Sequence, residues 1–245
     1  MAHIFITGSS AGLGQLAAQS LISQGHEVVL HARNEQRAKD AQRAVPDAET
    51  TVIGDLSNTQ ETKSLAEDVN AMGHFDAVIH NAGVYRASAN EILAVNTLAP
   101  YILTCLIQKP KRLIYLSSGM HKSGSPSIDQ IRSGEGISYS DSKLHAVMLA
   151  KAVARKWPEV YANAVDPGWV PTKMGGSGAP DDLRKGYETQ MWLAVSHDEK
   201  AKVNGNYFYH KKEATYNTEA DEIDVQEKFL ARCEQVTGVH FPAEG

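Results

Sequence analysis

The sequence is poor in cysteine and contains no long apolar run. Only Cys105 and Cys233 occur in 245 residues, and neither has cysteine or histidine neighbours at the spacing of a zinc site. We interpret both as reduced, structural residues and expect no metal. No stretch approaches the roughly 18 apolar residues that a membrane-spanning helix needs, and the first residues lack the basic start and apolar run of a signal peptide. These absences predict a soluble, cytoplasmic protein without a membrane span.

An excess of positive charge is absent as well. Lysine and arginine together number 24 against 29 aspartates and glutamates, which gives a formal net charge of −5. Binding to a nucleic-acid backbone requires a basic surface, so the composition argues against a nucleic-acid partner. The hydrophobic fraction of 42% is ordinary for a globular protein, and no repeat or linker divides the chain. We therefore expect a single domain over residues 1–245.

Short apolar runs alternate with helical patterns along the chain. Buried strands are predicted at 4–6, 27–31, 51–54, 75–80, 112–116, 160–165 and 206–209, and helices include 93–106, 139–156, 182–195 and 222–236. Asn34 is predicted to cap the helix after the second strand, and Ser57 the helix after the third. Strands separated by helices form right-handed crossovers and hence a parallel sheet covered on both faces.

The predicted fold class is accordingly α/β. We expect a Rossmann-type, doubly wound parallel sheet of about seven strands, with helices on both faces. A cofactor half would span roughly residues 1–110, and a catalytic and substrate half residues 111–245. Long loops follow the fifth and sixth strands, at the carboxyl edge of the sheet, where open α/β folds bind their ligands.

Glycines cluster where the first strand turns into the first helix. Gly8, Gly12 and Gly14 form the pattern Thr-Gly-x3-Gly-x-Gly, with Ser10 and Leu13 between them. Glycine permits a close approach, so backbone N–H groups and the helix N-terminus can bind a pyrophosphate there. The three glycines alone are weak evidence, because a tight turn without a ligand would show the same pattern. Their position at the first strand–helix turn favours a dinucleotide site.

A tyrosine and a lysine lie four residues apart in the predicted helix 139–156. This spacing puts Tyr139 and Lys143 on one face, with side chains about 5–6 Å apart. An ammonium favours a phenolate, so we expect Lys143 to lower the pKa of Tyr139 from its ordinary value of about 10. Tyr207 and Lys211 repeat the spacing, but at a predicted strand end, where residues four apart stand about 13 Å from each other. We interpret that second pair as structural.

In this order, the motifs resemble the short-chain dehydrogenase/reductase family over nearly the whole chain. The resemblance is carried by the glycine-rich turn, Asp55-Leu56, His80-Asn81-Ala82-Gly83, Asn96, Ser117-Ser118, Tyr139-x3-Lys143 and Asp166-Pro167-Gly168-x-Val170-x-Thr172. The C-terminal part looks like the retinol dehydrogenase-like branch. The segments on either side of Asn96 are shorter than in that branch, which implies trimmed helices. Because such helices often form the family's dimer contact, both a homodimer and a monomer stay open.

The resemblance implies four catalytic residues. Tyr139 would exchange the proton with the reacting oxygen, and Lys143 would tune it and reach the cofactor ribose. Ser118 would hydrogen-bond the reacting oxygen, with Ser117 as the alternative because the insertion before Tyr139 is long. Asn96 would shape its helix and hold a relay water, or else be an ordinary polar residue of a helix interior.

The cofactor-binding residues follow from the same motifs and from the end of the second strand. No acid stands there to bind the ribose 2′-OH of NAD. Arg33 and Arg37 can pair with a 2′-phosphate, although solvated surface arginines would look the same. We therefore expect NADP(H) rather than NAD(H). The predicted contacts are Gly8, Ser10, Gly12, Leu13, Gly14, Arg33, Asp55, Leu56, Asn81, Ala82, Gly83, Tyr139, Lys143, Pro167, Gly168, Val170 and Thr172.

The leading functional prediction is NADPH-dependent reduction of a ketone or aldehyde to an alcohol. The alternatives are a dinucleotide-binding sensor or scaffold without turnover, and NAD-dependent alcohol oxidation. An aromatic and methionine cluster after the sixth strand is either a substrate lid or core, and its apolarity favours a small lipophilic carbonyl or alcohol substrate. Its members are Trp169, Met174, Tyr187, Met191 and Trp192. His121, His145 and His197 lack metal-ligand spacing, so we interpret them as structural.

Overall fold

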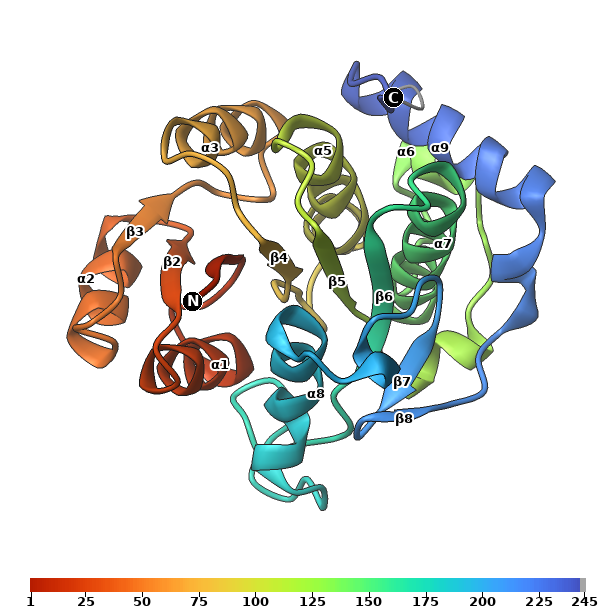
Figure 1. Ribbon diagram of the computed structural model, residues 1–245. Helices are drawn as coiled ribbons and strands as arrows, with labels where there is room; N and C mark the ends of the chain where they lie inside the picture. The colour runs from red at the N-terminus through yellow and green to blue at the C-terminus, as the bar shows by residue number, and fades with distance from the viewer. Residues whose placement is uncertain (243–245) are drawn as a thin grey trace.

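The computed structural model describes residues 1–242 and contains one sheet with helices on both faces (Figure 1). In these residues the strand order is β3-β2-β1-β4-β5-β6-β7-β8, parallel as far as β7. The predicted doubly wound parallel fold is confirmed. An eighth strand pairs antiparallel with β7. The strands are β1 (His3–Ile6), β2 (Glu27–Ala32), β3 (Thr50–Ile53), β4 (Ala77–His80), β5 (Arg112–Leu116), β6 (Tyr161–Asp166), β7 (Tyr207–Tyr209) and β8 (Lys212–Glu213).

Helices connect the strands and form the two outer layers. They are α1 (Gly12–Ser23), α2 (Glu35–Ala44), α3 (Thr59–Ala71), α4 (Ala89–Leu93), α5 (Ala99–Leu106), α6 (Gln130–Ser133), α7 (Tyr139–Lys156), α8 (Leu183–Val195) and α9 (Ile223–Thr237). None of the helices in residues 1–242 is long and apolar enough to cross a membrane.

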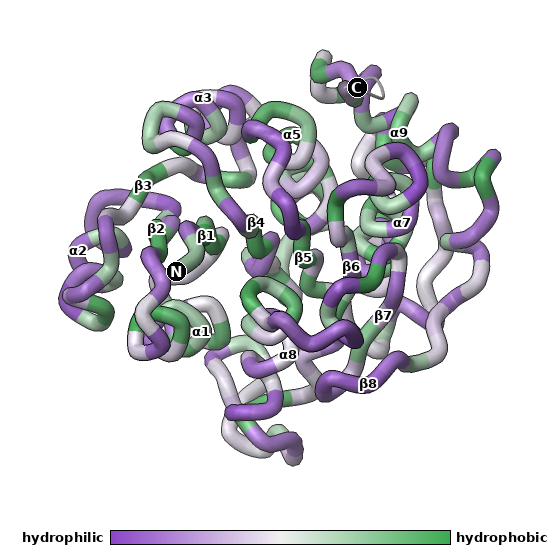
Figure 2. The backbone as a smooth tube through the Cα atoms, viewed as in Figure 1, coloured by the Kyte–Doolittle hydropathy of each residue, from purple (hydrophilic) through white to green (hydrophobic). Residues whose placement is uncertain are grey.

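The core consists of two apolar layers, one on each face of the sheet. In β1, Phe5 belongs to the layer under α3, α5, α7 and α9, whereas Ile4 and Ile6 belong to the layer under α1 and α8. All three side chains are fully buried, as expected for a strand covered on both faces. Figure 2 shows hydrophobic residues concentrated along the central strands.

The helix ends show which local signals hold. Asn34 caps α2 as predicted, because its side chain accepts a hydrogen bond from the backbone of Arg37 at 3.0 Å. The predicted Ser57 cap is wrong: Asn58 caps α3, while Ser57 bonds to the side chain of Asp55. The predicted helix 93–106 is interrupted by a π-helical turn at Ala94–Leu98. Such turns often occur at functional sites.

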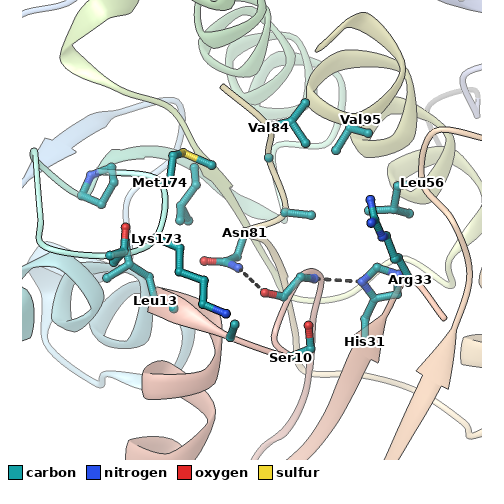
Figure 3. Close-up of a pocket in the computed structure, with 18 of the residues that line it drawn as sticks. Ser10, Leu13, His31, Arg33, Leu56, Asn81, Val84, Val95, Lys173 and Met174 are labelled. Carbon is teal, nitrogen blue, oxygen red and sulfur yellow. Dashed lines mark hydrogen bonds between the residues drawn. The ribbon is translucent and has the colours of Figure 1, made fainter. Parts of the chain in front are cut away.

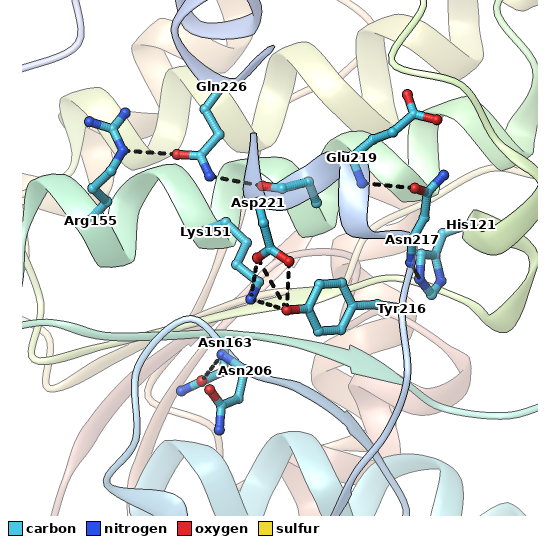
Figure 4. Close-up of polar contacts among 11 residues, drawn as sticks. His121, Lys151, Arg155, Asn163, Asn206, Tyr216, Asn217, Glu219, Asp221 and Gln226 are labelled. Atoms are coloured by element: carbon cyan, nitrogen blue, oxygen red, sulfur yellow. Dashed lines mark hydrogen bonds and ion pairs between the residues drawn. The ribbon is translucent and has the colours of Figure 1, made fainter. Parts of the chain in front are cut away.

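The segment before α9 folds back onto α7 (Figure 4). The ammonium of Lys151 lies 2.9 Å from the carboxylate of Asp221, and the Tyr216 hydroxyl donates to the same carboxylate. Further along α7, the Arg155 guanidinium donates to the Gln226 side chain at 2.9 Å. These contacts hold the helix that carries Tyr139 and Lys143 from its outer side.

Candidate active site

A cleft of about 400 Å³ opens at the carboxyl ends of the parallel strands (Figure 3). It lies between β1 and β4, where the strand order changes direction: β2 and β3 lie beyond β1, and β5 lies beyond β4. Sheets of this kind bind ligands at this switch point. Most predicted cofactor contacts line it: Gly8, Ser10, Gly12, Leu13, Arg33, Asp55, Leu56, Asn81, Ala82, Gly83, Tyr139, Lys143, Pro167 and Thr172. The structure thus brings together motifs from both halves of the chain.

Three predicted contacts lie outside the lining of the cleft. A side chain at Gly14 would collide with the Asn81 amide, so this glycine lets α1 pack closely on the turn after β4. Val170 is buried and contacts the position of Gly186 in α8. Gly168 has a φ of +81°, and its N–H donates a hydrogen bond to the Asp166 carboxylate. All three shape the walls of the cleft.

The glycine-rich turn presents unbonded backbone donors. Gly8 has a φ of +64°, and a Cβ there would lie 2.8 Å from the Cα of Ala82. Gly12 has a φ of +61°, and a Cβ there would meet open space. Within residues 1–242, no backbone N–H of residues 10–14 donates a hydrogen bond, and no side chain caps α1. Free N–H groups at the positive end of a helix suit an anionic ligand.

His31 fixes this turn to the sheet. Its Nδ1 accepts from the Gly8 N–H at 2.9 Å, and its Nε2–H donates to the Gly54 carbonyl at 2.9 Å. Burial lowers the pKa of His31 to about 4, so the ring is neutral at pH 7 and can play both roles. The sequence analysis assigned His31 no role. A histidine inside an otherwise apolar strand was the only signal available.

Asn96 joins the turn after β4 to α7, which carries Tyr139 and Lys143. Its Oδ1 accepts from the Val84 N–H at 2.8 Å, and its Nδ2 donates to the Val84 carbonyl and, at 3.0 Å, to the hydroxyl of Ser142 in α7. Asn96 is buried within the π-helical turn. This two-sided bonding favours a specific role for Asn96 over that of an ordinary helix residue.

The two serines after β5 differ in their bonding. The Ser117 hydroxyl is buried and donates to the Lys143 carbonyl at 2.7 Å, which ties β5 to α7. Ser118 is half-buried, its hydroxyl accepts from the Met120 N–H at 3.3 Å, and its proximity to Tyr139 acts to lower the pKa of that phenol. Its carbonyl accepts from the ring of His121, whose other nitrogen accepts from the Asn217 N–H. This geometry favours Ser118 as the residue that meets a reacting oxygen.

Tyr139 and Lys143 lie together as predicted, with the lysine ammonium 5.4 Å from the centre of the tyrosine ring. Their electrostatics differ from the expectation. Burial raises the pKa of Tyr139 to about 12, against the opposing effect of the Ser118 hydrogen bond, and the negative charge of Asp166 adds to the rise. Lys143 is itself buried, which lowers its pKa to about 8, and it donates to the Leu116 carbonyl at 2.9 Å. Without a cofactor, therefore, the lysine does not lower the tyrosine pKa.

Asp166, the last residue of β6, belongs to a motif that carries the family resemblance, but no role was expected for it. Its carboxylate ends β6 and accepts from the Gly168 N–H at 2.8 Å. The other oxygen lies 3.0 Å from where a Cβ of Gly119 would be, immediately after Ser118. The Tyr207 hydroxyl is buried without a hydrogen-bond partner in residues 1–242, and burial and the Asp166 charge raise its pKa. A negative group thus lies on the Ser118 side of the site.

The far end of the cleft carries positive charge. Arg33 and Arg37 both line it, and neither forms an ion pair with a carboxylate of residues 1–242. Partial burial opposes ionisation of Asp55, but hydrogen bonds from Ser57 and the Arg33 charge hold the pKa of that carboxyl below its usual value. The guanidinium groups are therefore available to a phosphate.

The aromatic and methionine cluster divides between loop and core. Trp169 is 60% exposed and Met174 48% exposed, both in the loop after β6. In α8, Met191 is buried, Trp192 packs edge-on against Phe208, and Tyr187 packs against the same apolar layer. The cluster is therefore part exposed loop and part core, and a lid role for the loop residues stays a prediction.

The remaining residues considered from sequence lie away from the chemistry. Lys211 pairs with Glu188 at 3.3 Å, outside the cleft, so the second tyrosine–lysine pair is structural. His145 bonds to Thr97 and to the Pro126 carbonyl, and burial lowers its pKa to about 4. His197 is exposed.

Comparison with known proteins identifies the family. The sequence profile of the short chain dehydrogenases matches residues 2–182. The chain belongs to this family. It is an oxidoreductase similar to AN7799, an oxidoreductase of Emericella nidulans, with 46% identity over 99% of each chain. Human retinol dehydrogenase 14 is 25% identical over 96% of this chain and 86% of its own. The predicted family is confirmed, and a retinol dehydrogenase is among its relatives.

Solved structures share the fold. A protein of Mycobacterium paratuberculosis superposes with a TM-score of 0.81 at 20% identity, covering 99% of this chain and 95% of that one. The NADPH-bound carbonyl reductase from chicken fatty liver has a TM-score of 0.68 at 21% identity, covering 88% and 99%. At these identities the likeness concerns the fold.

Proposed function

We propose that this oxidoreductase uses NADPH to reduce small lipophilic ketones or aldehydes to alcohols. The observation that carries the proposal is one cleft that holds an uncapped glycine-rich turn, Arg33 and Arg37 at its far end, and Tyr139 beside Lys143. The carbonyl reductase of the same fold was solved with NADPH, which supports this cofactor. The exposed Trp169 and Met174 beside the cleft support an apolar substrate.

The residues present fit a phosphorylated dinucleotide. The free N–H groups of residues 10–14 would bind its pyrophosphate, and Arg33 and Arg37 its 2′-phosphate. Asp55 and Leu56 line the cleft near Arg33 and would bind the adenine end. Lys143 would meet the ribose next to the reacting ring. When bound, the cofactor supplies the hydride.

The proton would come from Tyr139. With a pKa of about 12, its phenol is protonated at pH 7, so Tyr139 is a proton donor in the free protein rather than a base. A protonated phenol is the form that reduction of a carbonyl group requires. Ser118 would hold the carbonyl oxygen and stabilise the charge that develops on it. By family resemblance, Asn96 would hold a water through which, together with Lys143, a proton from solvent returns to the phenolate.

Consumption of NADPH with a panel of ketones and aldehydes tests this proposal. We expect turnover with apolar carbonyl compounds, and much weaker turnover with NADH in its place. NADPH binding without turnover of any compound would favour the sensor or scaffold. Turnover restricted to NAD and alcohols would favour the oxidation.

A further inference from the structure

One cationic side chain reaches into the cleft from the loop that follows β6. We call residues 167–182 the outer loop. Lys173 lines the same cleft as Ser10 and Leu13, and Figure 3 shows its side chain extending toward the turn that carries Ser10. The residue is exposed, and its ammonium makes no hydrogen bond or ion pair within residues 1–242. An ammonium without a protein partner therefore faces the glycine-rich turn.

The turn supplies no cation of its own. Residues 7–14 read Thr-Gly-Ser-Ser-Ala-Gly-Leu-Gly, without lysine, arginine or histidine. Its unbonded N–H groups offer dipoles, whereas a pyrophosphate brings two negative charges into a partly enclosed site. A group that balances this charge has to come from elsewhere in the cleft.

The other cations of the cleft are committed to different places. Arg33 directly follows β2 and lies past His31, and Arg37 lines the cleft from α2, where a 2′-phosphate would be bound. Lys143 is buried, donates to the Leu116 carbonyl, and lies beside Tyr139. Lys173 lines the cleft as well, and its side chain extends toward the turn.

We propose that Lys173 binds the pyrophosphate of the dinucleotide from the side opposite the glycine-rich turn. This inference rests on the proposed function and adds a binding residue to it. The pyrophosphate is common to NADPH and NADH, so Lys173 contributes to both equally. Arg33, in contrast, meets an anion only in NADPH. The two cations therefore divide the cofactor between them.

Binding affinities of four probes separate the two contributions. The probes are NADPH, NADH, ADP-ribose, which carries the pyrophosphate but no 2′-phosphate, and adenosine 2′-monophosphate, which carries only the latter. Titration calorimetry with wild type, Lys173→Gln and Arg33→Ala gives the dissociation constants without any turnover. Lys185→Gln is the matched control, because Lys185 is also an exposed lysine near the outer loop but does not line the cleft.

We expect Lys173→Gln to weaken NADPH, NADH and ADP-ribose alike, by about five- to twentyfold, and to leave adenosine 2′-monophosphate unchanged. Arg33→Ala should show the opposite pattern, weakening NADPH and adenosine 2′-monophosphate by about ten- to a hundredfold. The Lys173 effect should shrink at high salt, because an exposed charge is screened.

The outcomes distinguish a failure of the Lys173 contact from a failure of the proposed function. Unchanged ADP-ribose binding in Lys173→Gln, with normal binding by wild type, would overturn the inference alone. Equal losses in Lys173→Gln and Lys185→Gln would overturn it too, because they would reflect net charge. If wild type bound no dinucleotide, the proposed function would fail, and the inference with it.

Discussion

The two sides of the cleft differ in where their polar groups find partners. The inner side comprises residues 7–14, 81–83, 117–118 and 139–143. Its polar groups bond to other elements of the fold, as the Gly8 N–H does to the ring of His31 in β2, which in turn bonds to the Gly54 carbonyl. In the outer loop most hydrogen bonds join residues of the loop itself, as from the Trp169 indole to the Gly175 carbonyl at 2.8 Å. The inner side is thus tied to several elements of the fold, whereas the outer loop is tied mainly to itself.

Burial follows the same division. Lys143 is 6% exposed and His31 3% exposed, so their protonation is coupled to the stability of the fold. Trp169, Met174 and Lys173 are exposed in the outer loop. Changes on the inner side should therefore affect chemistry and stability, and changes in the outer loop mainly ligand binding.

The largest effect is expected for Tyr139→Phe. The phenyl ring keeps its contact with the ring of Tyr85, but the proton donor is lost. We expect kcat to fall by about 10²- to 10⁴-fold, with the dissociation constant of NADPH nearly unchanged. Steady-state kinetics and calorimetry measure the two quantities. Tyr161→Phe, at the start of β6 and outside the cleft, is the matched control. Retention of more than about a tenth of kcat would remove Tyr139 from this role.

Lys143→Met should lower activity while changing the pH dependence of stability. Burial lowers the pKa of Lys143 from 10.5 to about 8, which costs the native state about 3 kcal/mol as long as the lysine is charged. Between pH 8 and 10.5 the native state releases this proton before the unfolded state does, so the wild type gains stability as the pH rises. The variant lacks this gain.

Urea unfolding near neutral pH and near pH 10 measures that difference. We expect the stability of Lys143→Met relative to wild type to fall by roughly 2–3 kcal/mol over this interval. Lys39→Met, at an exposed position on α2, should show no such trend. A constant difference at both pH values would mean that Lys143 is not desolvated.

His31→Gln should show a pH trend of the same sign as Lys143→Met, but in the acidic range. Because burial lowers the pKa of His31 from 6.5 to about 4, its neutral ring stabilises the fold above pH 6.5, and this contribution is lost as the pH falls through 4. The variant should be less stable by about 1–2 kcal/mol at pH 7, and the deficit should shrink on acidification. Unfolding at pH 7 and near pH 4.5 tests it, with the exposed His197→Gln as control. A deficit that grows in acid would contradict this account.

Trp169→Phe is expected to have the smallest effect. The side chain is 60% exposed, so its replacement should change the free energy of unfolding by no more than about 0.5 kcal/mol. The change in tryptophan fluorescence on adding NADPH should nevertheless diminish strongly, because Trp169 lies four residues from Lys173 in the outer loop. The buried Trp157, at the end of α7, and Trp192, which packs against Phe208, serve as the constant background. An undiminished signal would place the reporter elsewhere.

The sequence predicts those parts of the site that depend on local spacing. The glycine-rich turn and the pair of Tyr139 and Lys143 follow from strand–helix order and helical periodicity. The hydrogen bonds of His31 depend on the strand register that brings it beside Gly8 and Gly54, about which local periodicity is silent. The raised pKa of Tyr139 likewise depends on burial and on the charge at the end of β6.

Smaller misses have the same origin. Ser57 and Asn58 are both good helix caps by residue type, and only the bond of Ser57 to the Asp55 side chain decides between them. In the π-helical turn, the amide of Asn96 makes two hydrogen bonds to the backbone of Val84, which lies in the loop after β4. Local periodicity does not predict this contact. Likewise, the sequence does not show that Lys173 faces the glycine-rich turn across the cleft, because the two segments are far apart in the chain.

Transfer of deuterium from labelled NADPH to product tests the central claim most directly. NADPH deuterated at the transferable position of its nicotinamide is incubated with the wild type and the panel of ketones and aldehydes, and the alcohols are analysed by mass spectrometry. The account predicts one deuterium on the former carbonyl carbon with wild type, and a loss of this product in Tyr139→Phe despite intact cofactor binding. Cofactor binding by wild type without deuterated alcohol from any carbonyl compound would contradict it.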